Sequence, residues 1–266
     1  MPAARNIDLT MAIFLAGVCN ETYSHLANDG SCILPVGYEA LHSFKATALN
    51  GREWFGFLVR SKSNAVVAFR GTATERDCVV DAEAFQTAFT FAPGKLRTHD
   101  GFTSTYASCR DEIVRALRAL PQSTTLYVTG HSMGGALATL HALDVAVNLR
   151  FRRLAVYTFA SPRVGNPLFA TAFNREISAS VRVVNVHDLV PRLPPAFLPL
   201  PEPRAMLRYQ HVRREFALAA QTGTVRGNHS LHTYMEALRG LKDEAANKLP
   251  VIPPRRRTLI SRRTPG

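Results

Sequence analysis

The chain has 266 residues, of which 46% are hydrophobic and 20% are charged, a composition typical of a soluble globular protein with one large core. The longest apolar run, residues 11–19, is too short to cross a bilayer, so the sequence predicts no transmembrane segment. The formal net charge is +12, and the sequence contains neither a phosphate-binding loop nor a C-x-x-C pair.

The first predicted element is an amphipathic helix from Asp8 to about Ala27. The same stretch loosely resembles a secretory leader, because Arg5 precedes an apolar run that ends at Cys19. However, Asp8 lies where a leader is positively charged, and no A-x-A cleavage site follows. We therefore expect a buried helix, and a protein that is either cytoplasmic or exported without a recognisable leader.

The next elements alternate between strands and helices. Strands are predicted at 54–60, 64–71, 125–130, 153–161, 180–186 and 209–218, and helices at 103–120, 134–149, 166–177 and 230–241. Such alternation is typical of an α/β protein with a mostly parallel sheet covered by helices. No linker divides the chain, so we expect one catalytic domain over 1–248.

Residues 249–266 form a separate basic segment with five arginines and no acid. Its prolines and its lack of an apolar period predict a disordered, solvated tail. Its charge suits nucleic acid and an anionic lipid surface equally. Since no aromatic residues for base stacking are interleaved with the arginines, we expect no nucleic-acid partner.

The four cysteines, Cys19, Cys32, Cys78 and Cys109, show no metal-ligand spacing. They are expected to be free thiols, although the sequence leaves a single disulfide open.

A serine lies between two glycines in "GHSMG", residues 130–134, where a predicted strand turns into a predicted helix. A nucleophile at such a junction is held in a strained conformation, and Gly130 and Gly134 let neighbouring backbone pass closely. The N–H of Met133, at the start of the helix, would point at the reacting carbonyl oxygen. In the alternative, Ser132 only caps the helix.

A nucleophilic serine needs a base and a carboxylate that orients the base. Asp188 directly follows the predicted strand 180–186, and loops at the carboxyl ends of parallel strands are where sites form. Asp144 lies three turns into a helix and is expected in solvent, while Asp243 follows every candidate histidine. The alternative role for Asp188 is to cap a turn before Pro191.

Two late histidines, in "NHSLHTY", compete for the role of base. His229 lies at a predicted junction between loop and helix, free to reach Ser132, whereas His232 lies inside the first helical turn, packed or solvated. The other histidines are expected to pack or to face solvent: His131 beside the turn at Ser132, His187 in its loop, His99 and His211 outside the reaction, and His25, His42 and His141 in surface or core positions.

Six blocks of this sequence, in order, resemble those of the class 3 lipases, the fungal-type lipases. They are "VVAFRGTATERDCVVDAEA", "HDGFTSTY", "VTGHSMGGALA", "YTFASPRVGNPLF", "RVVNVHDLVPRLPP" and "NHSLHTYMEAL". The resemblance covers residues 54–238 and implies the α/β-hydrolase fold. It places the acid at Asp188 and the base at His229, and it implies that Thr72 gives a backbone N–H and a hydroxyl to the oxyanion.

The resemblance also implies a lid over residues 74–91, where fungal-type lipases have a short amphipathic helix. The family usually has a tryptophan at the position of Cys78. Phe85, Phe89 and Phe91 alternate as in a strand or a pocket wall. We expect the apolar loop 194–203 to line an acyl pocket through Phe197 and Leu198.

Together these residues predict an acyl-enzyme mechanism. Ser132 attacks an ester, His229 moves the proton, Asp188 holds the imidazole, and Thr72 and Met133 stabilise the oxyanion, with no metal or cofactor. We expect a triacylglycerol lipase acting on an ester lipid at a lipid–water interface. A phospholipase A1 and a short-chain carboxylesterase remain open, as do a catalytically silent hydrolase-fold binding protein and a nucleic-acid binder that uses the tail.

Overall fold

The computed structural model describes residues 7–48, 51–72, 85–200 and 206–247. At its centre is a seven-stranded sheet with the order β1-β2-β3-β6-β7-β8-β11. These strands are β1 (Glu39–Ala48), β2 (Gly51–Arg60), β3 (Asn64–Phe69), β6 (Thr125–His131), β7 (Arg153–Phe159), β8 (Ala179–Asn185) and β11 (Glu215–Leu218). From β3 to β11 all neighbours are parallel, whereas β1, β2 and β3 pair antiparallel. The predicted, mostly parallel sheet is therefore confirmed.

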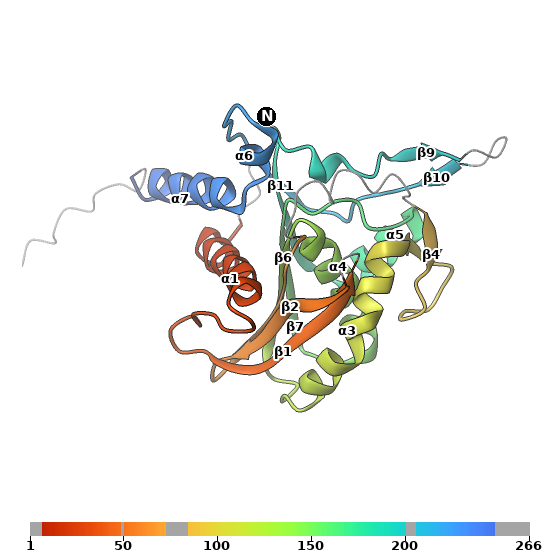
Figure 1. Ribbon diagram of the computed structural model, residues 1–266, viewed down its shortest axis with the longest axis horizontal. Helices are drawn as coiled ribbons and strands as arrows, with labels where there is room; N and C mark the ends of the chain where they lie inside the picture. Colours follow the sequence, from red (N-terminus) through yellow and green to blue (C-terminus); the bar gives the residue numbers. More distant parts are fainter. Residues whose placement is uncertain (1–6, 49–50, 73–84, 201–205, 248–266) are drawn as a thin grey trace, which may run out of the picture.

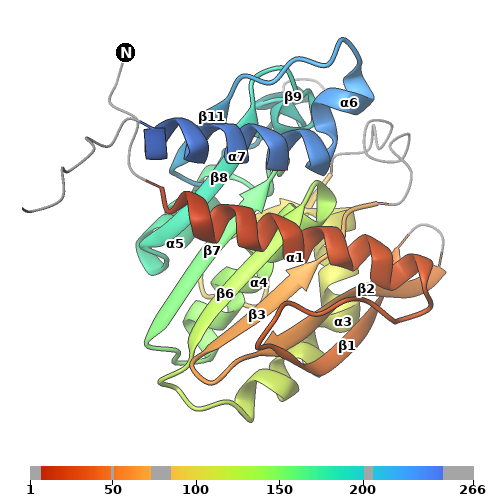
Figure 2. The same cartoon turned by 90° about the vertical axis from the view of Figure 1, so that its left-hand side faces the viewer.

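Helices cover both faces of this sheet (Figure 1). One face carries α1 (Leu9–Ala27) and α7 (Leu231–Asn247), which lie side by side in Figure 2, and the other carries α3 (Asp100–Arg118), α4 (Met133–Asn148) and α5 (Pro167–Glu176). In the part of the chain that the structure describes, no helix combines the length and the apolar character needed to span a membrane.

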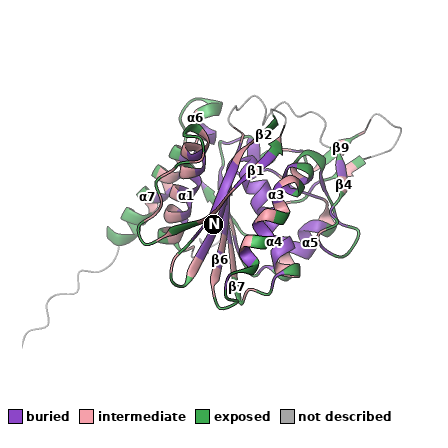
Figure 3. Cartoon of the chain, turned by 60° about the horizontal axis from the view of Figure 1, so that its bottom comes forward, coloured by how far each residue is buried: buried purple, intermediate pink, exposed green. Residues whose placement is uncertain are grey.

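The core is split by the sheet into two apolar layers. Along β3 the side chains of Ala65, Val67 and Phe69 enter the layer beneath α3 and α4, while Val66 and Ala68 enter the layer beneath α1 and α7. This follows from the two-residue period of a strand, and it explains why β3 is apolar on both faces. Figure 3 shows these strands buried between helices that are exposed on their outer sides.

Two predicted elements differ from the structure near the carboxyl end. The predicted strand 209–218 is wrong over its first half, because the chain at Gln210 bonds to Gly165 and Arg214 has a positive φ of 65°, so extended pairing with β8 begins only at Glu215. The predicted loop before the final helix is also wrong, because residues 225–229 form the short helix α6 (Val225–His229). Ser230, with an extended ψ of 130°, separates α6 from α7, which begins at Leu231 where the final helix is predicted. Thr224 caps α6 by accepting the N–H of Gly227.

Asp144 was expected in solvent, and that expectation is wrong. Its carboxylate is fully buried between α4 and α3, where Arg110 donates to both oxygens at 2.6 and 3.0 Å and the Tyr106 hydroxyl donates at 2.5 Å. Asp144 is buried because α3 packs against α4, which leaves no polar outer face at this turn. A buried carboxylate that accepts two N–H bonds from one guanidinium has a structural role.

His141 belongs to the same buried cluster, and its Nδ1 lies 3.1 Å from the Tyr106 hydroxyl. Burial lowers the pKa of His141 to about 4. The folded protein therefore holds this imidazole neutral at a pH where the unfolded chain, with an ordinary histidine pKa, is already protonated. The unfolded state binds more protons between about pH 6.5 and 4, so stability falls as the pH is lowered through that window.

We expect His141→Leu to flatten this acid dependence by up to about 1.4 kcal/mol per pH unit relative to the wild type. The measurement is urea unfolding of both proteins at several pH values between 7 and 4.5. Equal slopes in the two proteins would show that His141 does not contribute.

The segments outside the described residues leave several predictions open. The basic tail, 249–266, lies there, so the domain boundary at 248 stays a prediction. The predicted lid falls there over residues 74–84, with Cys78 among them. The other three cysteines, Cys19, Cys32 and Cys109, are free thiols.

Candidate active site

Ser132 occupies the sharp turn between β6 and α4 that the sequence predicts. Its backbone has φ 58° and ψ −129°, a strained conformation for a residue with a side chain. Neither flanking glycine could be replaced, because there is no room for a side chain at either position. A Cβ on Gly130 would lie 2.1 Å from the carbonyl oxygen of Gly134, and one on Gly134 would lie 2.3 Å from the carbonyl oxygen of Phe69.

Three of the predicted site residues form one chain of hydrogen bonds. The Nε2 of His229 lies 2.9 Å from the hydroxyl of Ser132, and its Nδ1 lies 2.8 Å from Oδ2 of Asp188. All three side chains are buried at the carboxyl ends of the parallel strands. Asp188 arrives in the turn after β8, and His229 is the last residue of α6. This arrangement allows a proton to move from the serine to an imidazole that a carboxylate holds in place.

Tyr234 is a part of the site that the sequence alone does not predict. Its hydroxyl donates to Oδ2 of Asp188 at 2.7 Å and accepts the N–H of Asn185 at 3.0 Å. The N–H of Val190 donates to the other carboxylate oxygen at 3.0 Å. Asp188 is thus fixed from two sides, and burial raises the pKa of Tyr234, which keeps its hydroxyl protonated as a donor.

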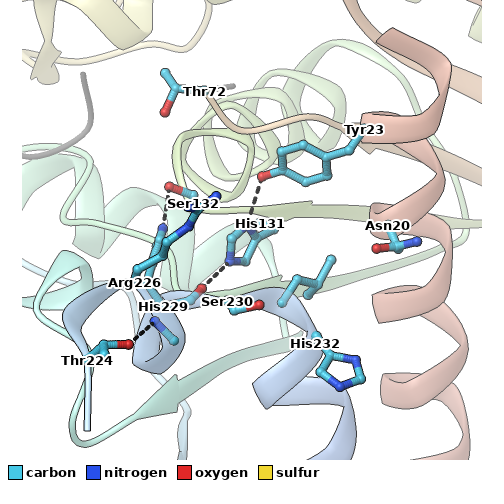
Figure 4. A pocket seen from close by; sticks show the side chains of 12 residues that line it. Asn20, Tyr23, Thr72, His131, Ser132, Thr224, Arg226, His229, Ser230 and His232 are labelled. Atoms are coloured by element: carbon cyan, nitrogen blue, oxygen red, sulfur yellow. Dashed lines mark hydrogen bonds between the residues drawn. The ribbon is translucent and has the colours of Figure 1, made fainter. Parts of the chain in front are cut away.

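His131 supports the backbone of His229. Its Nε2 lies 2.9 Å from the carbonyl oxygen of His229, and its Nδ1 lies 2.8 Å from the hydroxyl of Tyr23 (Figure 4). A carbonyl can only accept, so Nε2 carries the proton and Nδ1 accepts from Tyr23. Burial lowers the pKa of His131 to about 3, so it adds no positive charge beside His229. Its predicted place beside the turn at Ser132 is confirmed.

His232 lies on the exposed side of α7 and does not hydrogen-bond to Ser132 or Asp188 among the contacts of the described residues. His187 is exposed, as expected. His211 is not in a strand, and its Nε2 donates to the carbonyl of Pro191 at 2.6 Å, which makes it a packing group. Of the late histidines, the structure brings His229 alone to Ser132 within the described residues.

A pocket of about 490 Å³ opens at Ser132. Its lining residues are Asn20, Tyr23, Thr72, His131, Ser132, Thr224, Arg226, Gly227, His229, Ser230, Leu231 and His232. Figure 4 shows Thr72 on the opposite side of Ser132 from Thr224, and His229 between Ser132 and the short helix α6.

The sequence matches the model of a known family over residues 66–198, and that family is lipase (class 3). The chain belongs to the class 3 lipase family. The predicted resemblance is therefore confirmed.

Two curated relatives and one solved structure illustrate this similarity. Phospholipase A1 EG1 of Oryza sativa subsp. indica is 30% identical over 236 residues, covering 73% of this chain and 54% of that protein. The lipase of Rhizomucor miehei is 35% identical over 146 residues, covering 51% and 39%. A solved structure of the Rhizomucor miehei triacylglyceride lipase superposes with a TM-score of 0.60 at 26% identity, covering 71% of this chain and 74% of that one. The α/β-hydrolase fold is thus confirmed, and the chain spans about half the length of the curated relatives it matches.

The oxyanion donors of a class 3 lipase are expected here at Thr72 and Met133. Met133 begins α4, and the first N–H groups of a helix have no partner within the helix. Thr72 follows Gly71, where a Cβ would lie 2.8 Å from the carbonyl oxygen of His131 and 3.0 Å from the Cβ of Ser132. The missing side chain at Gly71 lets the chain pass directly against the turn at Ser132. Both residues therefore lie beside Ser132, and their role as oxyanion donors stays a prediction.

The predicted acyl pocket of the class 3 lipase is not settled by the described residues. Phe197 and Leu198 lie in β9 (Phe197–Pro199), which pairs with β10 (Met206–Arg208), and neither lines the pocket at Ser132 within the described part. Phe197 is 57% exposed, with the guanidinium of Arg208 over its ring. Of the three alternating phenylalanines, Phe89 is buried in the core and Phe85 is exposed, on either side of β4 (Gln86–Ala88).

Proposed function

We propose that this class 3 lipase is a serine-dependent carboxylic ester hydrolase that cleaves acylglycerols. The observation that carries the proposal is the hydrogen-bond chain from Ser132 through His229 to Asp188. The Ser132 oxygen attacks the ester carbonyl while its proton passes to Nε2 of His229, and the N–H groups of Thr72 and Met133 stabilise the oxyanion. His229 then gives the proton to the leaving alcohol, and water, activated by the same imidazole, releases the acid.

The lipid nature of the substrate is supported by two observations. The Rhizomucor relative is named a lipase, and the rice relative a phospholipase A1. In addition, exposed apolar side chains gather on segments at the carboxyl ends of the strands, namely Leu189, Phe197, Met206 and Val225. Figure 1 shows α6, β9 and β10 at that same end. We propose that this end meets a lipid–water interface.

Phospholipase A1 activity is the second candidate, and the relatives that carry that name favour it. The test is to label the purified protein with a fluorophosphonate and to measure rates on triolein and on phosphatidylcholine. The proposal requires covalent modification of Ser132 and release of fatty acid from at least one of the two lipids. A folded protein that takes no label and cleaves neither lipid would be a catalytically silent binding protein.

Asp188→Asn is expected to lower kcat by about 10⁴-fold, because the amide no longer fixes the imidazole of His229 in the tautomer that accepts the serine proton. The measurement is kcat on a soluble short-chain ester. Tyr234 and Val190 still hold the side chain in place, so the free energy of unfolding should change little by comparison.

The matched control is Asp144→Asn, the same chemical change at a buried aspartate outside the site. It removes the charge that Arg110 and Tyr106 contact, and it should cost about 3 kcal/mol of stability while leaving kcat near the wild-type value. If Asp144→Asn abolished turnover and Asp188→Asn did not, the acid would be misassigned.

A further inference from the structure

The pocket at Ser132 lies mainly on one side of the nucleophile. Seven of its twelve lining residues belong to the stretch 224–232, which contains His229. In ester hydrolysis the imidazole delivers its proton to the oxygen of the leaving alcohol. The alcohol half of the substrate therefore has to lie on the His229 side of Ser132, which is where this pocket is.

The lining of this pocket mixes polar and apolar surface and contains no carboxylate among the described residues. Hydroxyl and amide groups come from Asn20, Tyr23, Thr224 and Ser230, while Leu231 is the single large aliphatic side chain of the described lining. A diacylglycerol leaving group would present hydrocarbon to these groups, which would lose hydrogen bonds to water without replacement. A polar alcohol half is better matched.

Arg226 is the one arginine or lysine in the described lining of this pocket. It lies three residues before His229 on α6, so the two side chains project to neighbouring sides of the same helical turn. Figure 4 shows Arg226 beside Ser132 and His229.

The backbone that carries Arg226 is held at both ends. Thr224 caps the start of α6, and the carbonyl of Asn228 accepts from the side chain of Asn185 at 3.0 Å. The guanidinium is thus carried on a fixed segment next to the reacting atoms.

We propose that Arg226 and the hydroxyl and amide side chains around it form a subsite for the phosphate on the alcohol half of a glycerophospholipid. In such a lipid only the glycerol backbone separates the phosphate from the ester oxygen that His229 protonates. A guanidinium presents paired N–H donors that match two phosphate oxygens. The inference rests on the proposed ester hydrolase, and it makes Arg226 a specificity-determining residue that selects the alcohol half of the substrate.

The test compares two lipids with the same acyl chains, dioleoylphosphatidylcholine and 1,2-dioleoylglycerol, each in Triton X-100 micelles. The readout is the ratio of kcat/KM for phospholipid to kcat/KM for diacylglycerol. Arg226→Gln should lower this ratio by about ten-fold or more, because it removes charge-assisted hydrogen bonds to the phosphate. Arg226→Lys should recover part of the loss, and the effect should shrink as NaCl is added.

The matched control is Arg213→Gln, which removes the same charge from an exposed arginine that does not line the pocket. It should leave the ratio at the wild-type value, and since phosphatidylcholine has no net charge, general attraction to the micelle is small. The inference is overturned if Arg226→Gln leaves the ratio within two-fold of wild type, if it lowers both rates equally, or if the wild type cleaves only the diacylglycerol. In each of these cases Ser132-dependent cleavage of diacylglycerol would still support the ester hydrolase. A wild type that cleaves neither lipid would instead refute the ester hydrolase itself.

Discussion

Ser132→Ala is expected to lower ester hydrolysis by a factor of about 10³ to 10⁶, because the oxyanion donors and the binding pocket remain while the nucleophile is lost. Alanine keeps the Cβ, so the strained backbone at φ 58° is the same in both proteins. The fold should therefore survive, and the urea midpoint of unfolding should differ little from that of the wild type. The measurement is kcat on a soluble short-chain ester.

Labelling provides an independent readout for the same variant. The wild type should take up one fluorophosphonate per chain, and Ser132→Ala should take up none. A folded Ser132→Ala protein that still turned over ester at an appreciable fraction of the wild-type rate would remove Ser132 from the mechanism.

His229→Ala is expected to be as damaging as the loss of the serine, since the two side chains act as one unit. The 2.9 Å contact between Nε2 of His229 and the Ser132 hydroxyl would be gone, and so would the 2.8 Å contact between Nδ1 of His229 and Asp188. The matched control is His232→Ala, which removes an exposed imidazole three residues later in the same pocket wall. We expect it to keep most of the wild-type kcat on a soluble ester.

The reverse outcome for the two histidine variants would move the base to His232 and would require the start of α7 to shift by about one turn. Loss of activity in both variants, with both proteins folded, would mean that any substitution in this part of the pocket lining abolishes turnover of the short-chain ester. The short-chain substrate then has to be replaced by labelling kinetics, which report on the serine and its base alone.

The turn at Ser132 could be predicted because several independent features of the sequence indicate it. Gly130 and Gly134 are required because a Cβ on either would lie 2.1 or 2.3 Å from a backbone oxygen. An apolar strand precedes this pair and a helix follows it. Asp188 could be placed because parallel strands all deliver their following loops to one edge of the sheet. His229 lies beside Ser132 as its position before a helix suggested, although that position turned out to be the end of α6.

The environment of the site was less predictable, because it depends on which helices cover which others. Asp144 looks like a surface residue within α4 alone, and only the packing of α3 buries it. Tyr234 and His131 meet Asp188 and His229 across long separations in sequence, and one sequence carries no trace of such pairings. Residues 209–214 include the strand-forming Tyr209 and Val212, and the backbone bond from Gln210 to Gly165, which is distant in sequence, overrides that preference.

The late position of His229 has a consequence for how the protein is made. His229, the proposed base, follows Ser132, the proposed nucleophile, by 97 residues, and it lies between β11 and α7, the helix that packs on α1. A nascent chain emerging from the ribosome therefore carries the serine long before it carries the imidazole. On the proposed mechanism, a message truncated between the two codons encodes an inert product, and hydrolysis begins only when translation has passed the codon of His229. The order of synthesis thus delays the proposed reaction until the chain has passed His229.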